Sequence, residues 1–191
     1  MEEEKIRQFA KDNFVPIIRP KTLEYLIESV KVKNPKNILE IGTAIGYSGI
    51  KMLENSNANL VTIEKDEKMF KLAQENFREE NLTERIQLVF DDAMNFLKQN
   101  TQKFDFIFLD GPKGQYINYL PFLLNCLEKN GVMFCDNVLF QGLVNSNVEP
   151  PKKFRTIVRN LEKFILEIKQ NENLSYKLYD IEDGFLIVWK K

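Results

Sequence analysis

The sequence predicts an α/β domain built on a doubly wound, mostly parallel sheet of about seven strands with helices on both faces. Apolar runs of strand length recur along the chain, and the segments between them carry apolar residues at helical spacing. The first five runs are continuously apolar, as expected of strands that are covered on both faces. The last two are separated by the short stretch "IEDG", which predicts an antiparallel hairpin at the end of the sheet.

The elements follow one another without an interdomain linker, so we expect a single domain over residues 1–191, with residues 1–35 as a helical segment of it. Helices are expected at 2–13 and 20–33, and Pro20 suits the first turn of the second helix. An amphipathic helix is expected at 152–168. The strands are expected at residues 36–42, 59–64, 85–90, 104–110, 131–137, 174–180 and 184–190.

The composition excludes several classes of function. The chain has no histidine, which rules out an imidazole base, the serine hydrolase triads and the usual catalytic zinc sites. A net charge of −1 gives no overall attraction to nucleic acid, so a polyanionic partner would need a local basic patch. We expect a cytoplasmic protein without a membrane span, and reduced Cys126 and Cys135, because no long apolar run or leader pattern occurs and both cysteines lie in apolar runs.

A glycine-rich turn, G-T-A-I-G-Y-S-G over residues 42–49, follows the first predicted strand. In a doubly wound sheet this turn lies at the ligand-binding edge, and its glycines let the backbone approach a ligand. The spacing is neither the G-x-G-x-x-G of dinucleotide enzymes nor a P-loop, which disfavours NAD and ATP. Glu64, at the end of the second strand, is placed to bind ribose hydroxyls. The candidate cofactor contacts are Glu40, Gly42, Thr43, Gly46, Tyr47, Ser48, Glu64, Asp92, Ala93 and Asp110.

Oxygen-bearing side chains stand at the ends of the fourth and fifth predicted strands. Asp110 ends the fourth strand, and Asp136 and Asn137 end the fifth. Adjacent parallel strands bring these side chains to one point, and hard oxygen ligands suit Mg²⁺, Mn²⁺ or Ca²⁺. Each residue taken alone fits a helix cap or a turn equally well. Taken together they suit a metal site with coordination positions left for water and substrate, and the resemblance described next implies that Asp110 and Lys113 take part in catalysis there.

These residues resemble the motifs of a known family. The stretch E-I-G-x-x-x-G from Glu40 to Gly46, with the D-x-x-K of Asp110 and Lys113 and the D-N of Asp136 and Asn137, is similar to the class I, divalent-cation-dependent O-methyltransferases of the catechol and caffeoyl-coenzyme A type. The resemblance implies a Rossmann-like fold, S-adenosylmethionine as cofactor and a cation that activates a substrate hydroxyl. Lys113 would then act either as a general base or as a cation that stabilises the oxyanion.

Basic residues gather on the predicted helix at 152–168. Residues 150–170 hold six lysines and arginines against two glutamates, a local charge of +4 in a chain of −1. A solvated helix face could have the same composition, whereas a polyanionic substrate would use it for phosphate contacts. The candidate RNA-binding residues are Arg19, Lys152, Lys153, Arg155 and Arg159.

A narrower resemblance concerns the acceptor. The stretches "VPIIRPKTLEYL", "PKNILEIGTAIGYSGIKM", "KGQY" and "DNVLFQGLV" are similar to the bacterial tRNA 5-hydroxyuridine O-methyltransferases. This implies a homodimer that methylates the 5-hydroxyl of a wobble uridine, in the tRNA anticodon loop, to 5-methoxyuridine. Tyr47, Tyr116 and Phe140 could stack on a splayed base, and Tyr116 and Phe140 could equally belong to the core. Asp91 stands where the family pattern commonly has glycine, and Asp92, with the backbone N–H that follows it, is still expected to contact the adenine edge of the cofactor.

Three other functions are compatible with parts of the pattern. The same catalytic residues could act on a small catechol-like or hydroxycinnamoyl substrate, which would need no basic helix. A non-catalytic cofactor-binding or RNA-binding protein on the same scaffold would not need the metal and lysine set. An NAD-dependent oxidoreductase is disfavoured by the glycine spacing.

Overall fold

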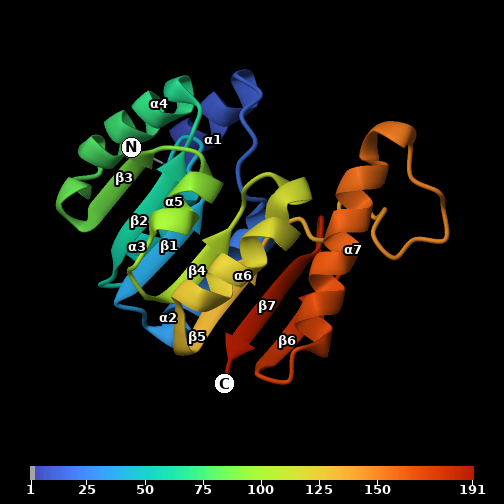
Figure 1. The fold of residues 1–191 in the computed structure, drawn as a ribbon. Helices are drawn as coiled ribbons and strands as arrows, with labels where there is room; N and C mark the ends of the chain where they lie inside the picture. The colour runs from blue at the N-terminus through green and yellow to red at the C-terminus, as the bar shows by residue number, and fades with distance from the viewer. Residues whose placement is uncertain (1–2) are drawn as a thin grey trace.

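The computed structural model describes residues 3–191, and its order of elements follows the predicted alternation of strands and helices. Figure 1 shows a sheet with helices on both sides. The helices are α1 (Glu3–Asp12), α2 (Pro20–Lys33), α3 (Tyr47–Glu54), α4 (Glu67–Glu79), α5 (Ala93–Gln99), α6 (Tyr116–Cys126) and α7 (Arg155–Gln170). The strands are β1 (Asn37–Ile41), β2 (Asn59–Glu64), β3 (Ile86–Phe90), β4 (Phe104–Leu109), β5 (Leu127–Cys135), β6 (Leu174–Tyr179) and β7 (Phe185–Lys190).

The seven strands form one sheet in the order β3-β2-β1-β4-β5-β7-β6. Strands β1 to β5 pair in parallel, and β7 pairs antiparallel with both β5 and β6. Strands β1 to β3 are added toward one side of the sheet, and β4 and β5 are added on the other side of β1. The position between β1 and β4 is therefore the topological switch point, where such folds bind ligands. The predicted fold class and the terminal hairpin are therefore confirmed, and β7 lies inside the sheet between β5 and β6.

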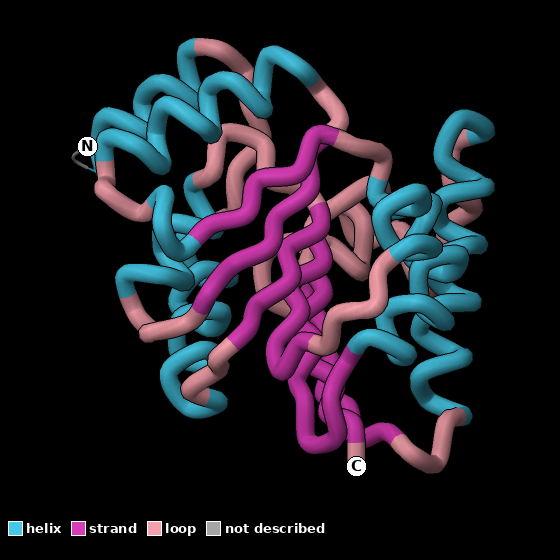
Figure 2. The backbone as a smooth tube through the Cα atoms, turned by 60° about the vertical axis from the view of Figure 1, so that its left-hand side comes forward, coloured by secondary structure: helices cyan, strands magenta, loops and turns pink. Residues whose placement is uncertain are grey.

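Two apolar cores cover the two faces of the sheet, because successive strand side chains point to opposite sides. In β4, Phe106 and Phe108 enter the core under α2, α3 and α4, whereas Ile107 and Leu109 enter the core under α5, α6 and α7. Figure 2 shows the strands between these two layers of helices. The continuously apolar strands thus reflect burial on both faces.

The observed boundaries differ from the predicted ones by more than one residue at two elements. The amphipathic helix begins as a 3-10 turn, Lys152–Phe154, and continues as α7 to Gln170. Strand β5 begins at Leu127, four residues earlier than predicted, and ends at Cys135. The cysteines Cys126 and Cys135 are buried and unpaired, as predicted. Within residues 3–191, no helix is both long and apolar enough to cross a membrane.

Candidate active site

The glycine turn after β1 brings the ends of β1 and β4 into close contact. Gly42 has a φ of 99°, and a Cβ atom there would lie 2.4 Å from the backbone oxygen of Asp110. Gly46, at a φ of 83°, ends the turn and precedes the first residue of α3. Both positions favour glycine, because a side chain at positive φ is strained and at Gly42 would also meet backbone. The turn therefore places the N-terminus of α3 beside the end of β4.

Beneath this turn, Glu40 is fully buried and bonded to two hydroxyl groups. Ser48 Oγ donates to Glu40 Oε1 at 2.5 Å, and Thr62 Oγ1 donates to Oε2 at 2.6 Å. Burial raises the pKa of Glu40 to about 7, although both hydrogen bonds oppose the shift. Thr43 adds a 2.6 Å hydroxyl contact to Thr62. Glu40, Thr43 and Ser48 thus support the turn from behind.

Glu64, by contrast, faces the pocket from the end of β2. Its Oε2 accepts a hydrogen bond from the Ala44 N–H at 2.8 Å, and its Oε1 accepts from the N–H groups of Lys65 and Asp66 at 2.9 and 2.8 Å. Three backbone donors therefore hold the carboxylate in one orientation. The carboxylate predicted to bind ribose hydroxyls therefore lines the pocket in a fixed orientation.

Asp92 lies at the N-terminus of α5, on the same side of the pocket. Its Oδ1 accepts from the Met94 N–H at 2.9 Å as a helix cap, and its Oδ2 lies 3.6 Å from Lys65 Nζ. Asp91, the residue before it, accepts from the Asp92 N–H at 2.7 Å. Asp92 and Ala93 both lie in the pocket wall.

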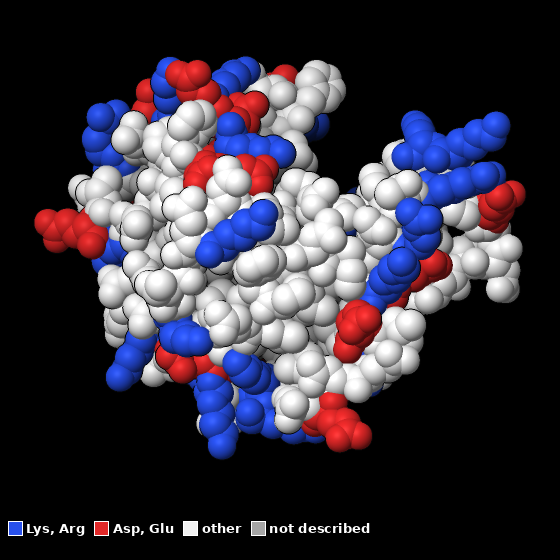
Figure 3. All heavy atoms as spheres, in the orientation of Figure 1, with Lys and Arg blue, Asp and Glu red and all other residues white. Residues whose placement is uncertain are grey.

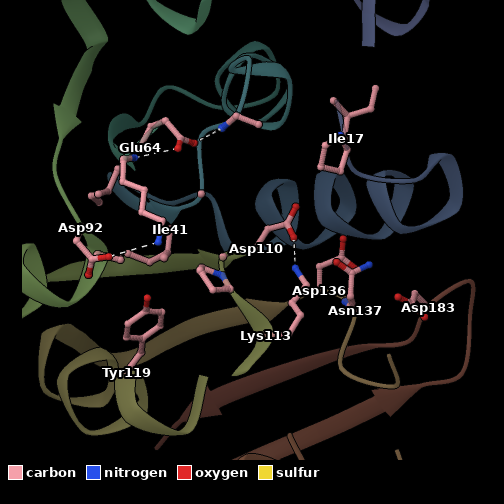
Figure 4. Close-up of a pocket in the computed structure, with 18 of the residues that line it drawn as sticks. Ile17, Ile41, Glu64, Asp92, Asp110, Lys113, Tyr119, Asp136, Asn137 and Asp183 are labelled. Carbon is pink, nitrogen blue, oxygen red and sulfur yellow. Dashed lines mark hydrogen bonds and ion pairs between the residues drawn. The ribbon is translucent and has the colours of Figure 1, made fainter. Parts of the chain in front are cut away.

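The predicted oxygen cluster forms at the ends of β4 and β5, as Figure 4 shows for Asp110, Asp136 and Asn137. Lys113 Nζ lies 2.5 Å from Asp110 Oδ1, and both side chains are largely buried. Asp136 is only 3% exposed. Burial, and secondly the charge of Asp110, raise its pKa from 3.8 to about 7. Two carboxyl groups held together out of water favour binding of a cation.

The donor set fits a hard divalent cation. Among the described residues, no group of three or more Asp, Glu, His or Cys side chains could hold a metal, so the candidate set consists of two carboxylates and the Asn137 amide. Mg²⁺ is commonly held by one or two carboxylates and completes its coordination with water and substrate. Asp110, Asp136 and Asn137 meet that description.

A pocket of about 480 Å³ joins the two groups of side chains. Figure 4 shows Glu64, Asp92 and Tyr119 at one end, and Asp110, Asp136, Asn137 and Asp183 at the other. The predicted site residues in its lining are Arg19, Gly42, Glu64, Asp92, Ala93, Asp110, Lys113, Asp136 and Asn137. The lining also includes Pro16, Ile17, Lys65, Tyr119 and Asp183, which the sequence did not single out as site residues.

Two of the three aromatics considered for base stacking belong to the core. Tyr47 and Tyr116 are 1% and 0% exposed, so stacking on an acceptor base is wrong for both. The Tyr116 hydroxyl instead donates to the carbonyl oxygens of Leu109 and Asp136, at 3.0 and 3.1 Å. Phe140 does line the pocket. Its ring centroid lies 5.3 Å from that of Phe154, edge to face.

The basic residues at the start of the predicted helix are exposed, and of the predicted RNA-binding residues Arg19 alone is in the pocket lining. Asn160 of α7 donates to the Gly114 oxygen at 2.8 Å, which fixes the helix against the turn that carries Lys113. Lys153 Nζ lies 4.6 Å from the Phe154 ring centroid, and Arg155 pairs with Glu149 at 2.6 Å. Figure 3 shows Lys and Arg side chains gathered along the exposed side of α7. The exposed basic residues here are Lys152, Lys153, Arg155 and Arg159.

The sheet order and the ligand-binding edge define a class I methyltransferase fold. A family model described as O-methyltransferase matches residues 4–191, so the chain belongs to the O-methyltransferase family, in the caffeoyl-CoA and catechol group. A catechol O-methyltransferase of Niastella koreensis is 32% identical over 141 residues, which are 70% of this chain and 64% of that protein. Caffeoyl-CoA O-methyltransferase 2 of Petunia hybrida is 26% identical over 155 residues, 77% of this chain and 63% of that protein. The chain thus spans less than two thirds of the length of these relatives.

Solved structures agree with this assignment over the whole chain. The O-methyltransferase from Bacillus cereus, solved in complex with SAH, has a TM-score of 0.88 and 27% sequence identity, and the match covers 99% of this chain and 90% of that one. The SAH-bound methyltransferase PaMTH1 of Podospora anserina has a TM-score of 0.78 and 26% identity, and the match covers 100% of this chain and 97% of that one. The family predicted from the E-I-G-x-x-x-G, D-x-x-K and D-N motifs is therefore confirmed.

Proposed function

We propose that the protein transfers a methyl group from S-adenosylmethionine to a hydroxyl of an acceptor that presents two neighbouring oxygens to a divalent cation. The observation that carries the proposal is that one pocket holds Glu64 and Asp92 at one end and Asp110, Asp136 and Asn137 at the other. This separation suits a donor and an acceptor bound side by side. Family membership supports the same reaction.

The donor end is suited to the nucleoside part of S-adenosylmethionine. The fixed carboxylate of Glu64 would accept hydrogen bonds from the ribose hydroxyls, and Asp92 with the Ala93 N–H would contact the adenine edge. Gly42 lets the backbone approach the remainder of the cofactor without a side chain between them. Glu40 and Ser48 act beneath the turn by holding its shape.

At the acceptor end, Asp110, Asp136 and Asn137 would hold Mg²⁺, or Mn²⁺ or Ca²⁺ in its place. When bound, the cation supplies a Lewis acid that lowers the pKa of the acceptor hydroxyl. Lys113, whose Nζ lies 2.5 Å from Asp110 Oδ1, would either take the hydroxyl proton in its neutral form or stabilise the oxyanion by its charge. The acceptor oxyanion would then attack the sulfonium methyl group in line, so that the O–CH3 bond forms as the S–CH3 bond breaks and S-adenosylhomocysteine leaves.

The acceptor we favour is 5-hydroxyuridine at the tRNA wobble position, converted to 5-methoxyuridine by a cytoplasmic homodimer. Its 5-hydroxyl and 4-carbonyl present two adjacent oxygens, as a catechol does. The exposed basic residues at the start of α7 lie on the helix that Asn160 joins to the Lys113 turn, and they would contact the phosphates of an anticodon loop. A small catechol-like or hydroxycinnamoyl acceptor is the second candidate, favoured by the names of the relatives described above.

The test is methyl transfer from labelled S-adenosylmethionine, with Mg²⁺ or with EDTA, to three acceptors assayed in parallel. These are a tRNA bearing 5-hydroxyuridine, the same tRNA with unmodified uridine, and catechol. Labelling of the hydroxylated tRNA alone, abolished by EDTA, supports the favoured acceptor. Labelling of catechol alone shifts the function to a small molecule, and labelling of none contradicts the proposal.

A further inference from the structure

The turn between β6 and β7 contacts the loop that follows β5. The Val138 N–H donates to the Gly184 oxygen at 2.9 Å, and the Leu139 N–H donates to the Asp183 oxygen at 3.1 Å. The Gln141 N–H donates to the carboxylate of Asp183. Three hydrogen bonds, from the N–H groups of Val138, Leu139 and Gln141, therefore join the turn to the loop that begins at Asn137.

The contact is close because of a glycine. Gly184 has a φ of 70°, and a Cβ atom there would lie 2.2 Å from Leu139 Cγ. Any side chain at this position would displace the loop from the turn. The sequence "EDG" thus provides both the carboxylate and the space that the contact requires.

The loop after β5 adopts a backbone conformation that needs external support. Asn137, Phe140 and Gln141 have φ values of 55°, 43° and 59°, in the left-handed region that side chains disfavour. Such conformations persist where the surrounding structure holds them. Within the loop, Leu143 and Val144 donate to Phe140 and Leu139 at 3.1 Å, while the Gln141 N–H bonds to Asp183.

We propose that Asp183 is a positioning residue for the acceptor end of the pocket. By accepting the Gln141 N–H, its carboxylate holds the 137–141 loop so that Asn137 and Phe140 face the pocket. Asn137 and Phe140 both line the pocket, and Figure 4 shows Asp183 beside Asn137. The proposal rests on the proposed function, in which Asn137 holds the cation and the acceptor lies against Phe140.

Three variants separate this role from others. Asp183→Ala removes the hydrogen-bond acceptor, Asp183→Asn keeps an oxygen acceptor but removes the charge, and Asp180→Ala removes an exposed carboxylate from the same turn as a matched control. Losing a hydrogen bond to a charged group corresponds to about a tenfold change in an equilibrium constant. We therefore expect Asp183→Ala to raise the acceptor KM about tenfold, with kcat changed less and the affinity for S-adenosylhomocysteine unchanged.

Besides the acceptor KM, a second measurement tests the role of Asp183 and needs no substrate. Amide hydrogen exchange over residues 138–141 should become faster in Asp183→Ala and stay near the wild-type rate in Asp183→Asn and Asp180→Ala. Wild-type exchange in Asp183→Ala would overturn the proposal. So would an acceptor KM that rises as much in Asp183→Asn as in Asp183→Ala, because the charge would then act directly. If the wild-type protein methylates none of the acceptors, the proposed function fails while the exchange data still decide the role of Asp183.

Discussion

Lys113 Nζ lies 2.5 Å from Asp110 Oδ1, on a 3-10 turn that Asn160 of α7 ties down through the Gly114 oxygen. The ammonium group therefore has a fixed position at the acceptor end of the pocket, beside a proposed cation ligand. Lys113 can serve the reaction in two ways: its charged form can stabilise the acceptor oxyanion, and its neutral form can accept the hydroxyl proton. Two substitutions distinguish these roles.

Lys113→Met should lower kcat by about 100-fold or more, because both a general base and a charge stabiliser would be lost. Lys113→Arg keeps the charge but cannot accept a proton at neutral pH. Near-normal kcat in the arginine variant would assign Lys113 as the stabiliser, and loss in both variants would assign it as the base. Steady-state kinetics with the favoured acceptor measure this, and a wild-type rate in Lys113→Met contradicts either role.

Asp136→Ala should abolish turnover while leaving the affinity for S-adenosylhomocysteine within about twofold, because the donor end of the pocket does not use this residue. Isothermal titration calorimetry gives the cofactor affinity, and the methyl-transfer assay gives turnover. Glu64→Ala is the matched control, because it should weaken cofactor binding instead. Turnover of Asp136→Ala that persists in EDTA would remove the proposed role of the cation.

The raised pKa of Glu40 predicts that the free energy of unfolding depends on pH. Its pKa rises from 4.5 to about 7 on folding, so the folded protein holds the proton more tightly than the unfolded chain. The stabilisation is complete below pH 4.5 and is lost as the pH rises through 7. Glu40→Gln stays neutral, so its stability relative to the wild type should increase between pH 5 and pH 8 by a few kcal/mol, at about 1.4 kcal/mol per unit of pKa.

Urea unfolding at both pH values, with EDTA present, measures this difference. Asp136 also has a raised pKa, but it is unchanged in both proteins and its contribution cancels in the comparison. The same difference at pH 5 and pH 8 would show that Glu40 is ionised in the folded protein throughout.

Gly42→Ala should destabilise the protein and weaken binding of S-adenosylhomocysteine, because the new Cβ would lie 2.4 Å from the Asp110 oxygen. Gly142→Ala is the matched control: its φ is 70°, but nothing lies within 4 Å of the new Cβ. The control should cost only about 1–2 kcal/mol of left-handed backbone strain and leave cofactor affinity unchanged. Thermal unfolding and calorimetry of both variants test this. Equal losses in the two would mean that the turn tolerates the side chain.

Reversing the charge of Arg155 and Arg159 should weaken tRNA binding and lower the slope of log affinity against log salt by about 1.5, if both contact phosphates of a single-stranded loop. The double variant Lys98→Glu with Lys129→Glu changes net charge equally, at two exposed positions in the last turn of α5 and near the start of β5. The tRNA affinity of each double variant, measured at several salt concentrations, shows whether the position of the charges matters. Equal losses of tRNA affinity in the two double variants would mean that the basic residues of α7 are a solvated helix face that does not contact tRNA.

The sequence predicted the fold and much of the site because both depend on local patterns. Continuous apolar runs locate the strands, and parallel strands bring Asp110, Asp136 and Asn137 together at one edge. The support beneath the site was not predictable in this way. Glu40 bonds Thr62, 22 residues away, and Asp183 bonds Gln141, 42 residues away. The second contact depends on β7 pairing with β5, which no local pattern specifies.

The place of β7 inside the sheet also constrains the order of assembly during translation. Strand β6 pairs with β7, and β7 leaves the ribosome after β6. Strand β6 therefore cannot join the sheet until the later strand has paired with β5. Until then the nascent chain presents the unpaired edge of β5, which makes this edge the place where a chaperone or a second unfinished chain would bind.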